Sequence, residues 1–139
     1  AQEKSIVFSG SFRTMYEAKA ETKVVEELYG RNNIKIFYIK LSEEESVTRN
    51  ASRRICEANR HPIPNLPEFQ NIEVCPHDGS KLIKRALDTP DVIRKRYQEY
   101  MNRTAPVLNF FMEQGFNILE INGTQGIEKV TQDIAQYFT

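Results

Sequence analysis

Residues 49–96 read RNASRRICEANRHPIPNLPEFQNIEVCPHDGSKLIKRALDTPDVIRKR, and this stretch decides how the rest of the chain is interpreted. It contains both cysteines and both histidines of the chain, with arginines on either side of them. A candidate metal site and a candidate anion site therefore share one segment. The prolines of HPIPNLP and the turn sequence DGS predict an irregular or small β-rich insert between Cys56 and Ile83.

The insert offers two short pairs of metal ligands separated by a loop. Cys56 pairs with His61, and Cys75 pairs with His77 or Asp78. A structural zinc ion needs four nitrogen, sulfur or oxygen ligands in a tetrahedron, and two such pairs supply them. One disulfide or two unpaired thiols are the alternatives. The histidines nearby and the polar surroundings favour a metal site in a reducing compartment.

Arginines near the ends of the predicted elements form the candidate anion site: Arg13, Arg49, Arg53, Arg85 and Arg96. Guanidinium groups bind phosphate oxygens through two parallel hydrogen bonds and can neutralise the charge that spreads during phosphoryl transfer. The alternative is a set of solvated surface arginines with weak ion pairs. None of the six glycines belongs to a G-x-x-x-x-G-K-[ST] motif, so the 139 residues include no phosphate loop of the kind found in most NTPases. No Ser/His/Asp or Cys/His arrangement indicates nucleophilic catalysis, because both histidines lie in the insert.

Length and composition predict one soluble domain. The 139 residues are 40% hydrophobic and 27% charged, as in an ordinary globular domain. The 19 basic and 19 acidic residues balance, so any binding of phosphate must be local rather than driven by net charge. Neither a membrane-spanning apolar run nor a leader-like start is present, which predicts a cytoplasmic location.

On the amino-terminal side of the insert, the pattern alternates between strand and helix. SIVF at 5–8 predicts a buried strand, and apolar residues at helical spacing predict a helix over 15–29 that stops at Gly30. IKIFYIKL at 34–41 predicts a second strand. Ser42 and Glu45 then fit a capping box, which opens a helix reaching about Arg54. That helix would carry Arg49 and Arg53 on one face.

The alternation continues after the insert. Thr89 and Pro90 predict a helix start, and Pro106 either kinks that helix or begins a new one that ends at Gly115. Residues 116–121 predict a third strand, and 127–138 an amphipathic last helix. Such alternation predicts an α/β fold with a parallel sheet. Ligands of such sheets bind at the carboxyl ends of the strands, where SGSFRT and INGT fall.

Several motifs resemble adenylate kinases, in the right order along nearly the whole chain. SGSFRT at 9–14 is similar to that family's DGFPRT, and RNASRRIC at 49–56 to its R-x-x-G-R-R segment leading into the lid. KRALDTPDVIRKRYQEYMNRTAPV at 84–107 is similar to the stretch after the lid, and INGTQGIEKV at 121–130 to the last nucleotide loop and helix. The resemblance implies a P-loop-kinase-like core and transfer of a phosphoryl group from ATP to a nucleoside monophosphate.

The resemblance also implies roles for individual residues. Arg13 would hold the monophosphate and Arg49 would lie against the ATP base. The backbone of residues 122–125 would contact the adenine. The catalytic arginines around the transferring phosphate would be Arg53, Arg85 and Arg96. The residues that bind the nucleotides would be Gly10, Arg13, Thr14, Glu17, Arg49, Asn122, Gly123 and Gln125.

Two metals follow from the resemblance, a structural Zn²⁺ in the lid and a Mg²⁺ that accompanies ATP. The preferred zinc ligands are Cys56, His61, Cys75 and Asp78, with His77 as the alternative to Asp78. The division into domains would be residues 1–54 and 85–139 for the core and 55–84 for the lid. His61 replaces the family's second cysteine, which would fall at Asn59, so the first ligand pair is irregular.

The chain also departs from the family pattern. The first strand of the family, its phosphate loop and its monophosphate-binding insert have no counterpart in the 139 residues. Because that strand is central in the family's sheet, its loss predicts a gap between strands, with unpaired backbone groups. We expect a carboxyl-terminal piece whose other half is supplied elsewhere, by a second chain or by another partner, and little catalysis without it. Ser9 and Leu87 stand where the family has aspartates, while Asp88 is kept.

Two hypotheses about ligands complete the sequence-based expectations. Glu17 stands where the family has a base-reading glutamine, and a carboxylate, which only accepts hydrogen bonds, suits the donors of guanine. The acceptor would then not be strictly AMP. The alternative to an enzyme is a non-catalytic module with a zinc-stabilised, arginine-rich lid that binds a nucleotide or RNA.

Overall fold

The structure, a computed structural model, describes residues 4–138 and divides into two compact units. Unit 1 consists of Ala1–Ile39, Glu99–Asn122 and Gly126–Thr139, and unit 2 of Lys40–Gln98 and Gly123–Gln125. Within the described residues, no helix is both long enough and apolar enough to cross a membrane.

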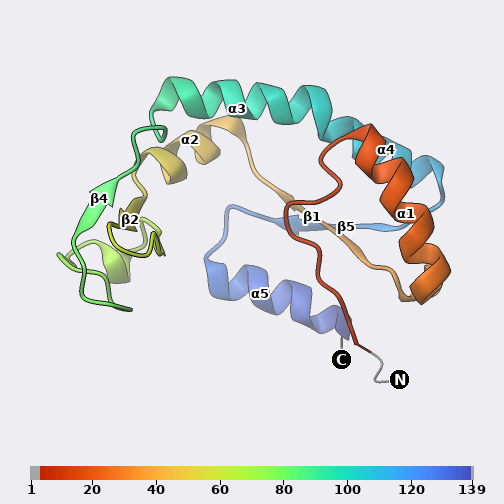
Figure 1. The fold of residues 1–139 in the computed structure, drawn as a ribbon, viewed down its shortest axis with the longest axis horizontal. Coiled ribbons are helices and arrows are strands. Elements are labelled where there is room, and N and C mark those ends of the chain that lie inside the picture. The colour runs from red at the N-terminus through yellow and green to blue at the C-terminus, as the bar shows by residue number, and fades with distance from the viewer. Residues whose placement is uncertain (1–3, 139) are drawn as a thin grey trace. The chain divides into compact units, whose positions relative to one another are not determined.

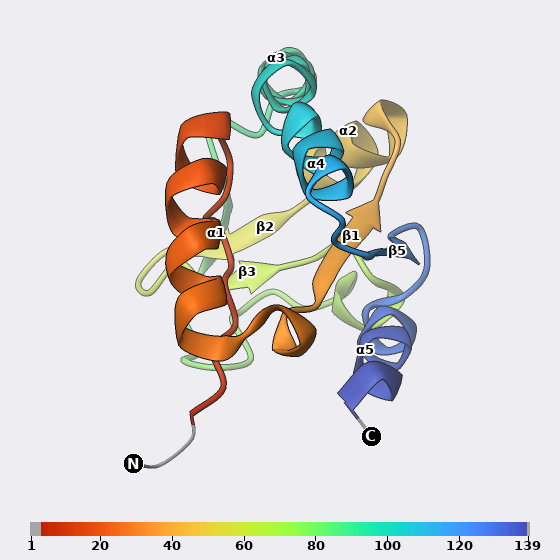
Figure 2. The same cartoon turned by 90° about the vertical axis from the view of Figure 1, so that its right-hand side faces the viewer.

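Unit 1 is a parallel two-stranded sheet with helices on both faces. Its helix α1 and helix α4 lie on one side of the sheet and α5 on the other (Figures 1 and 2). The elements are α1 (Met15–Tyr29), a 3-10 turn (Arg31–Asn33), β1 (Ile36–Lys40), α4 (Ala105–Glu113), β5 (Ile118–Asn122), α5 (Ile127–Ala135) and a final 3-10 turn (Gln136–Phe138). This arrangement confirms the predicted α/β fold with a parallel sheet.

The core of unit 1 lies between α1, α4 and the sheet. Ala18, Val107, Phe111 and Phe116 are buried there, and the ring of Phe111 packs edge-on against that of Phe116 with 5.6 Å between centroids. Aromatic pairs in this geometry contribute about 0.5–1.5 kcal/mol beyond the area they bury. On the opposite face of the sheet, the ring of Phe37 packs against the rings of Tyr137 and Phe138 in the 3-10 turn after α5.

Helix α1 has the predicted bounds because both of its ends are specified locally. Thr14 Oγ1 accepts from the Glu17 amide, and the Glu17 carboxylate accepts from the Thr14 amide, which forms a complete capping box. Gly30 ends the helix at φ 75°, a conformation that favours glycine, and its amide donates to the Glu26 carbonyl.

Unit 2 contains the small β-rich insert that the prolines predicted. Strand β2 (Arg54–Cys56) pairs in antiparallel register with β3 (Pro62–Ile63) on one side and β4 (Leu82–Lys84) on the other. Cys56, Ile63 and Cys75 form its buried centre, with Phe69, Ile72 and Leu82 packed around them. The unit also contains α2 (Glu43–Ala51), a 3-10 turn (Pro67–Phe69) and the start of α3 (Pro90–Arg103).

The helix starts after the insert are as predicted. Thr89 precedes α3, whose first residue is Pro90, and Pro106 lies in the first turn of a new helix, α4, rather than in a kink. The last helix is shorter than predicted, because α5 ends at Ala135 and a 3-10 turn follows.

The prediction of a strand at residues 5–8 was wrong. These residues form no strand, and Ile6, Val7 and Phe8 are 54%, 89% and 47% exposed. A strand is held by hydrogen bonds to a neighbour, and within the described residues the sheet of unit 1 contains only β1 and β5. Apolar β-branched residues therefore remain exposed, as the expected gap in the sheet implies.

The prediction for α2 was wrong at its end and partly wrong at its start. The helix stops at Ala51, so Arg53 does not share a helical face with Arg49. The Ser52 hydroxyl donates to the Thr48 carbonyl, and Arg54 already pairs with Lys84 in the sheet. Only half of the predicted capping box is present: Ser42 Oγ accepts from the Glu45 amide, while the Glu45 carboxylate binds Arg49 instead.

Truncation of the aromatic centre of unit 1 tests this packing. We expect Phe111→Ala to lower the free energy of unfolding by about 3–5 kcal/mol, because it leaves a cavity between α4 and the sheet. Met112, the exposed neighbour of Phe111 on the same helix, gives a matched control. Met112→Ala should change the free energy of unfolding by no more than about 0.5 kcal/mol. Urea denaturation measures both, and equal losses would contradict this account of the core.

Candidate functional site

The predicted metal ligands come together at the centre of unit 2. The ligand atoms of Cys56, His61, Cys75 and Asp78 all lie within 4.8 Å of one another. Cys56 ends β2, His61 precedes β3, and Cys75 and Asp78 belong to a tight turn in which the Gly79 amide donates to the Cys75 carbonyl. Of the two alternatives for the fourth ligand, Asp78 is the one in this group.

The separations between these atoms fit a tetrahedral zinc site. Cys75 Sγ lies 3.5 Å from His61 Nδ1, and His61 Nδ1 lies 3.3 Å from Asp78 Oδ2. Ligands at ordinary zinc distances would be about 3.6 Å and 3.4 Å apart in a tetrahedron. Cys56 Sγ and Asp78 Oδ2 are 3.0 Å apart, somewhat closer than the roughly 3.5 Å that a zinc ion would require. The chemistry of the donors and these three separations therefore fit the ion, which small movements of the ligands would accommodate.

Neighbouring polar groups hold the ligands in place. Asn59, where the family's second cysteine would fall, donates its side-chain amide to Asp78 Oδ2 and its backbone amide to Cys56 Sγ. The Ser80 hydroxyl also donates to Cys56 Sγ, and the Ser80 amide to Asp78 Oδ1. Such outer partners fix the orientation of metal ligands.

The same contacts shift the pKa values of the ligands. Hydrogen bonds from Cys56, the Ser80 amide and Asn59 hold the pKa of the Asp78 carboxyl below its usual value. Burial raises the pKa of the Cys56 thiol, but hydrogen bonds from Ser80 and from backbone groups outweigh it and leave that pKa below the ordinary value. Burial raises the pKa of the Cys75 thiol. Cys56 is thus the thiol that ionises more readily.

The sheet of the insert brings two predicted catalytic arginines to one end. Arg54 on β2 is paired with Lys84 on β4 in antiparallel register. Arg53, just before Arg54, and Arg85, just after Lys84, therefore lie at the same end of the sheet. The chain then turns, with the Asp88 amide donating to the Arg85 carbonyl at 3.0 Å. This turn places the Asp88 carboxylate beside the Arg53 guanidinium.

Asp88 is a buried carboxylate between arginines. Its side chain is 2% exposed, and Oδ2 accepts from Arg53 Nη2 at 2.8 Å and from Arg53 Nε at 3.2 Å. Oδ1 lies 4.0 Å from Arg96 Nη1, too far for a hydrogen bond, and Arg96 itself is 61% exposed. The structure therefore brings the guanidinium groups of Arg53 and Arg96 to one buried carboxylate, places Arg85 next along the chain from the Arg54–Lys84 pair, and leaves the guanidinium of Arg96 accessible.

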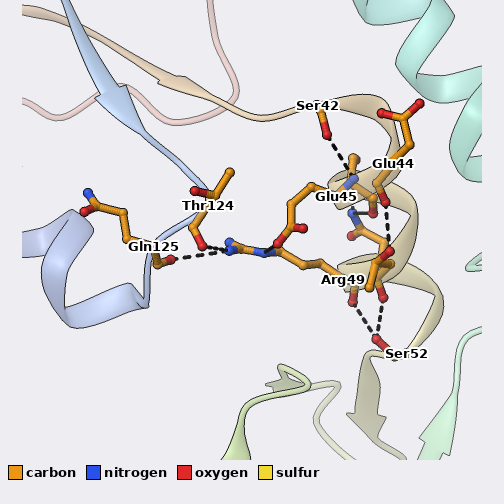
Figure 3. Close-up of polar contacts among 10 residues, drawn as sticks. Ser42, Glu44, Glu45, Arg49, Ser52, Thr124 and Gln125 are labelled. Carbon is orange, nitrogen blue, oxygen red and sulfur yellow. Dashed lines mark hydrogen bonds and ion pairs between the residues drawn. The ribbon is translucent and has the colours of Figure 1, made fainter.

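Arg49 lies at the loop that was predicted to contact adenine. Its Nη2 donates to the Thr124 carbonyl at 2.7 Å and reaches the Gln125 carbonyl at 3.4 Å, while its Nε donates to Glu45 at 2.7 Å (Figure 3). The loop is fixed from its other end as well, because the Gly123 amide donates to the Lys40 carbonyl at 2.8 Å. Residues some 75 positions apart thereby form one small site.

The predicted monophosphate-binding residues lie together in unit 1. A Cβ atom on Gly10 would lie 3.0 Å from Arg13 Nη2, so the Arg13 side chain lies over Gly10, whose φ of 89° favours glycine. Gly10 and Phe12 both have positive φ, and the Thr104 hydroxyl donates to the Arg13 carbonyl. Glu17 has a structural task here, since its carboxylate accepts from the amides of Arg13 and Thr14.

One cavity of unit 1 does not coincide with these residues. It measures about 470 Å³ and is lined by α4, the sheet and Met101, with Tyr38, Met112 and Glu120 among its walls. None of the predicted site residues lines it.

Two residues of the site were not assigned to it from the sequence. Asp88 was recognised only as a retained lid aspartate, and Glu45 only as a capping residue. The spacing of four between Glu45 and Arg49 was the available signal for the second pair. The contact between Asp88 and Arg53 depends on the register of β2 with β4, which the sequence did not reveal.

Comparison with known proteins confirms the resemblance that the motifs indicated. The chain is 31% identical over 137 residues to an adenylate kinase of Bacillus velezensis, covering 96% of this chain and 61% of that protein. It is 32% identical over 134 residues to one of Staphylococcus aureus and 34% identical over 132 residues to one of Petrotoga mobilis, in each case covering 94% of this chain and 60% of the relative. No protein-family model matches the chain.

The chain is therefore a homologue of adenylate kinases over nearly its whole length, and it spans about 60% of the length of the curated relatives it matches. This proportion agrees with the expectation that the chain corresponds to the carboxyl-terminal part of such an enzyme.

The buried carboxylate of Asp88 can be tested through stability. We expect Arg53→Met to lower the free energy of unfolding by about 3 kcal/mol, because it leaves a buried negative charge without its main partner. Combining it with Asp88→Leu should restore much of the loss, since both charges are then gone. Arg94→Met removes an exposed arginine of the same unit and should cost at most about 1 kcal/mol. Urea denaturation of the variants checks this, and no recovery in the double variant would contradict it.

Proposed function

We propose that this homologue of adenylate kinases provides the lid and the carboxyl-terminal core of an enzyme that transfers a phosphoryl group from ATP to a nucleoside monophosphate. The observation that carries the proposal is the contact of Arg53 and Arg96 with Asp88 at the base of the insert, where Arg85 lies at the same end of the β2–β4 pairing as Arg53. Phosphoryl transfer relies mainly on positioning and on neutralising charge, and guanidinium groups do both. Asp88 offsets part of the mutual repulsion of the arginines and holds Arg53 in place.

The donor nucleotide is proposed to bind beside Arg49. The faces of a guanidinium group stack on aromatic rings, and the edge of this one is held by Glu45 and the Thr124 carbonyl. The loop turns carbonyl oxygens towards this position, and such acceptors suit the exocyclic amino group of adenine better than the O6 acceptor of guanine. ATP is therefore the proposed donor, accompanied by Mg²⁺, which would neutralise part of the phosphate charge.

The acceptor is proposed to bind through Arg13, with Gly10 and Thr14 shaping the loop around it. The base of the acceptor would lie near Glu17, whose carboxylate can only accept hydrogen bonds. One of its oxygens already caps α1. We propose that the acceptor is not restricted to AMP. Parallel activity assays with AMP and GMP test this, and a large preference for AMP would contradict it.

The remaining parts of the site are proposed to come from outside residues 1–139. A phosphate loop with its lysine is absent from this sequence, and the curated relatives are longer. We propose that the loop is supplied by the same natural polypeptide or by a second chain. Residues 1–139 alone should then transfer phosphate poorly.

The insert is proposed to hold one structural Zn²⁺ through Cys56, His61, Cys75 and Asp78. The fit of their separations to a tetrahedron and the outer hydrogen bonds from Asn59 and Ser80 support this. Thiolate ligation requires reduced cysteines, in agreement with the cytoplasmic location predicted from the sequence. The ion would tie β2, through Cys56, to the turn that precedes β4, at the end of the sheet opposite Arg53 and Arg85.

A matched pair of arginines tests the catalytic proposal in the natural full-length protein. Arg85→Ala should lower kcat by about 10²–10³-fold, because a charge that stabilises the transferring phosphate is lost. Arg94→Ala makes the same change outside the site and should leave kcat close to the wild-type value. A coupled assay with ATP and either AMP or GMP measures this. RNA retention that falls steeply with salt, with no phosphoryl transfer, would refute the proposal and favour the RNA-binding alternative.

A matched pair of histidines tests the metal proposal. Metal analysis should find one zinc per chain, and His61→Ala should weaken binding by more than about 100-fold, since even outer partners change affinity 10- to 100-fold. His77 is exposed, with its ring 5.0 Å from that of His61, and His77→Ala should retain the ion. Thiol titration provides a second readout, because bound cysteines are protected. A metal-free protein with two reactive thiols would rule out the site.

A further inference from the structure

Glu45 is connected to the proposed nucleotide site through its contact with Arg49. The sequence assigned its carboxylate to the start of α2, but the structure directs it along the helix to Arg49 Nε at 2.7 Å. Glu45 is 35% and Arg49 40% exposed on their side chains, so the pair lies at the surface of unit 2. A surface pair of this kind adds only about 0.3–0.5 kcal/mol to helix stability, which gives no strong structural reason for it.

The geometry of the contact does more than pair two charges. Glu45 binds Nε, the nitrogen nearest the side-chain stem, and the Thr124 carbonyl binds Nη2, on a terminal arm of the group. Two hydrogen bonds on the edge of a planar group fix the plane itself. The carboxylate and the carbonyl are contributed by α2 and by the loop after β5, so the plane of Arg49 is fixed relative to that loop (Figure 3).

A guanidinium group held in this way is suited to a base rather than to a phosphate. Its edge hydrogen bonds are directed to Glu45 and the loop, and the carboxylate neutralises its charge, which reduces its value for an anion. Its flat faces remain suited to stacking on a purine. An arginine without Glu45 would have to lose its rotational freedom when the nucleotide binds, and this loss weakens binding.

We propose that Glu45 is a positioning residue for the donor nucleotide, which presents the face of Arg49 to the purine base of ATP. The inference rests on the proposed function, because it assumes that ATP binds beside Arg49. Glu45 touches neither the phosphates nor the reacting atoms, and it acts through Arg49 alone.

The test is a double-mutant cycle on the natural full-length protein, with ATP and inorganic tripolyphosphate titrated by calorimetry. Glu45→Ala should weaken ATP binding by about three- to tenfold, the cost of immobilising one long side chain. It should leave tripolyphosphate binding unchanged, because that ligand has no base. In the Arg49→Ala background, Glu45→Ala should have no further effect on ATP. Glu45→Gln, which keeps an acceptor for Nε, should retain most of the affinity.

Glu44→Ala is the matched control, since Glu44 is an exposed acid in the same first turn of α2. It removes the same charge from the helix start and should leave ATP binding at the wild-type value. The inference is overturned if Glu45→Ala weakens tripolyphosphate as much as ATP, if the effect persists without Arg49, or if Glu44→Ala matches it. Wild-type protein that binds no ATP would overturn the proposed function and this inference together, whereas ATP binding that is insensitive to Glu45→Ala would overturn the inference alone.

Discussion

The pairing of β1 with β5 is the constraint on which the position of the loop at 123–125 depends, and with it the nucleotide site that we propose beside Arg49. These strands are more than 75 residues apart, and their parallel arrangement makes both carboxyl ends meet at one edge of the sheet. The hydrogen bond from the Gly123 amide to the Lys40 carbonyl continues the pairing just beyond the strands. It holds the loop at 123–125 next to the start of α2, and so Arg49 can reach Thr124 and Gln125. Without this pairing, Arg49 would keep Glu45 as a partner but would lose its contacts with the loop carbonyls.

The sequence predicted the elements with local signals better than those that need a distant partner. Helix α1 has its predicted bounds, because Thr14, Glu17 and Gly30 specify both ends within a few residues. Residues 5–8 have the composition of a strand, but a strand also needs a neighbour, and the described residues provide none next to them. The end of α2 was misplaced for the same reason, since Arg54 is drawn into a sheet whose register the sequence does not show.

Two glutamates illustrate how far residue patterns carry a functional prediction. Glu45 fitted a capping box with Ser42, and Glu17 was placed at the acceptor base. In the structure the complete capping box belongs to Glu17 and Thr14, while Glu45 turns to Arg49. Both positions satisfy the spacing of three from a capping residue, and only the three-dimensional neighbours decide which carboxylate is used for the cap. For Glu45, an arginine four residues on offers a charged donor that competes with the backbone amide of the cap.

The candidate metal ligands and the arginines are connected through one small sheet of unit 2. Cys56 and Leu82 are opposite each other in the sheet, and two residues further along the same strands Arg54 is opposite Lys84. A four-ligand ion would hold β2 through Cys56 and, through Cys75 and Asp78, the turn that leads into β4. Any rotation of one strand against the other at the ligands would therefore displace Arg53 relative to Arg85 and Asp88. A bound zinc ion would thus fix the spacing of the arginines that we propose to be catalytic, because a short antiparallel sheet transmits the position of its ligands to its opposite end.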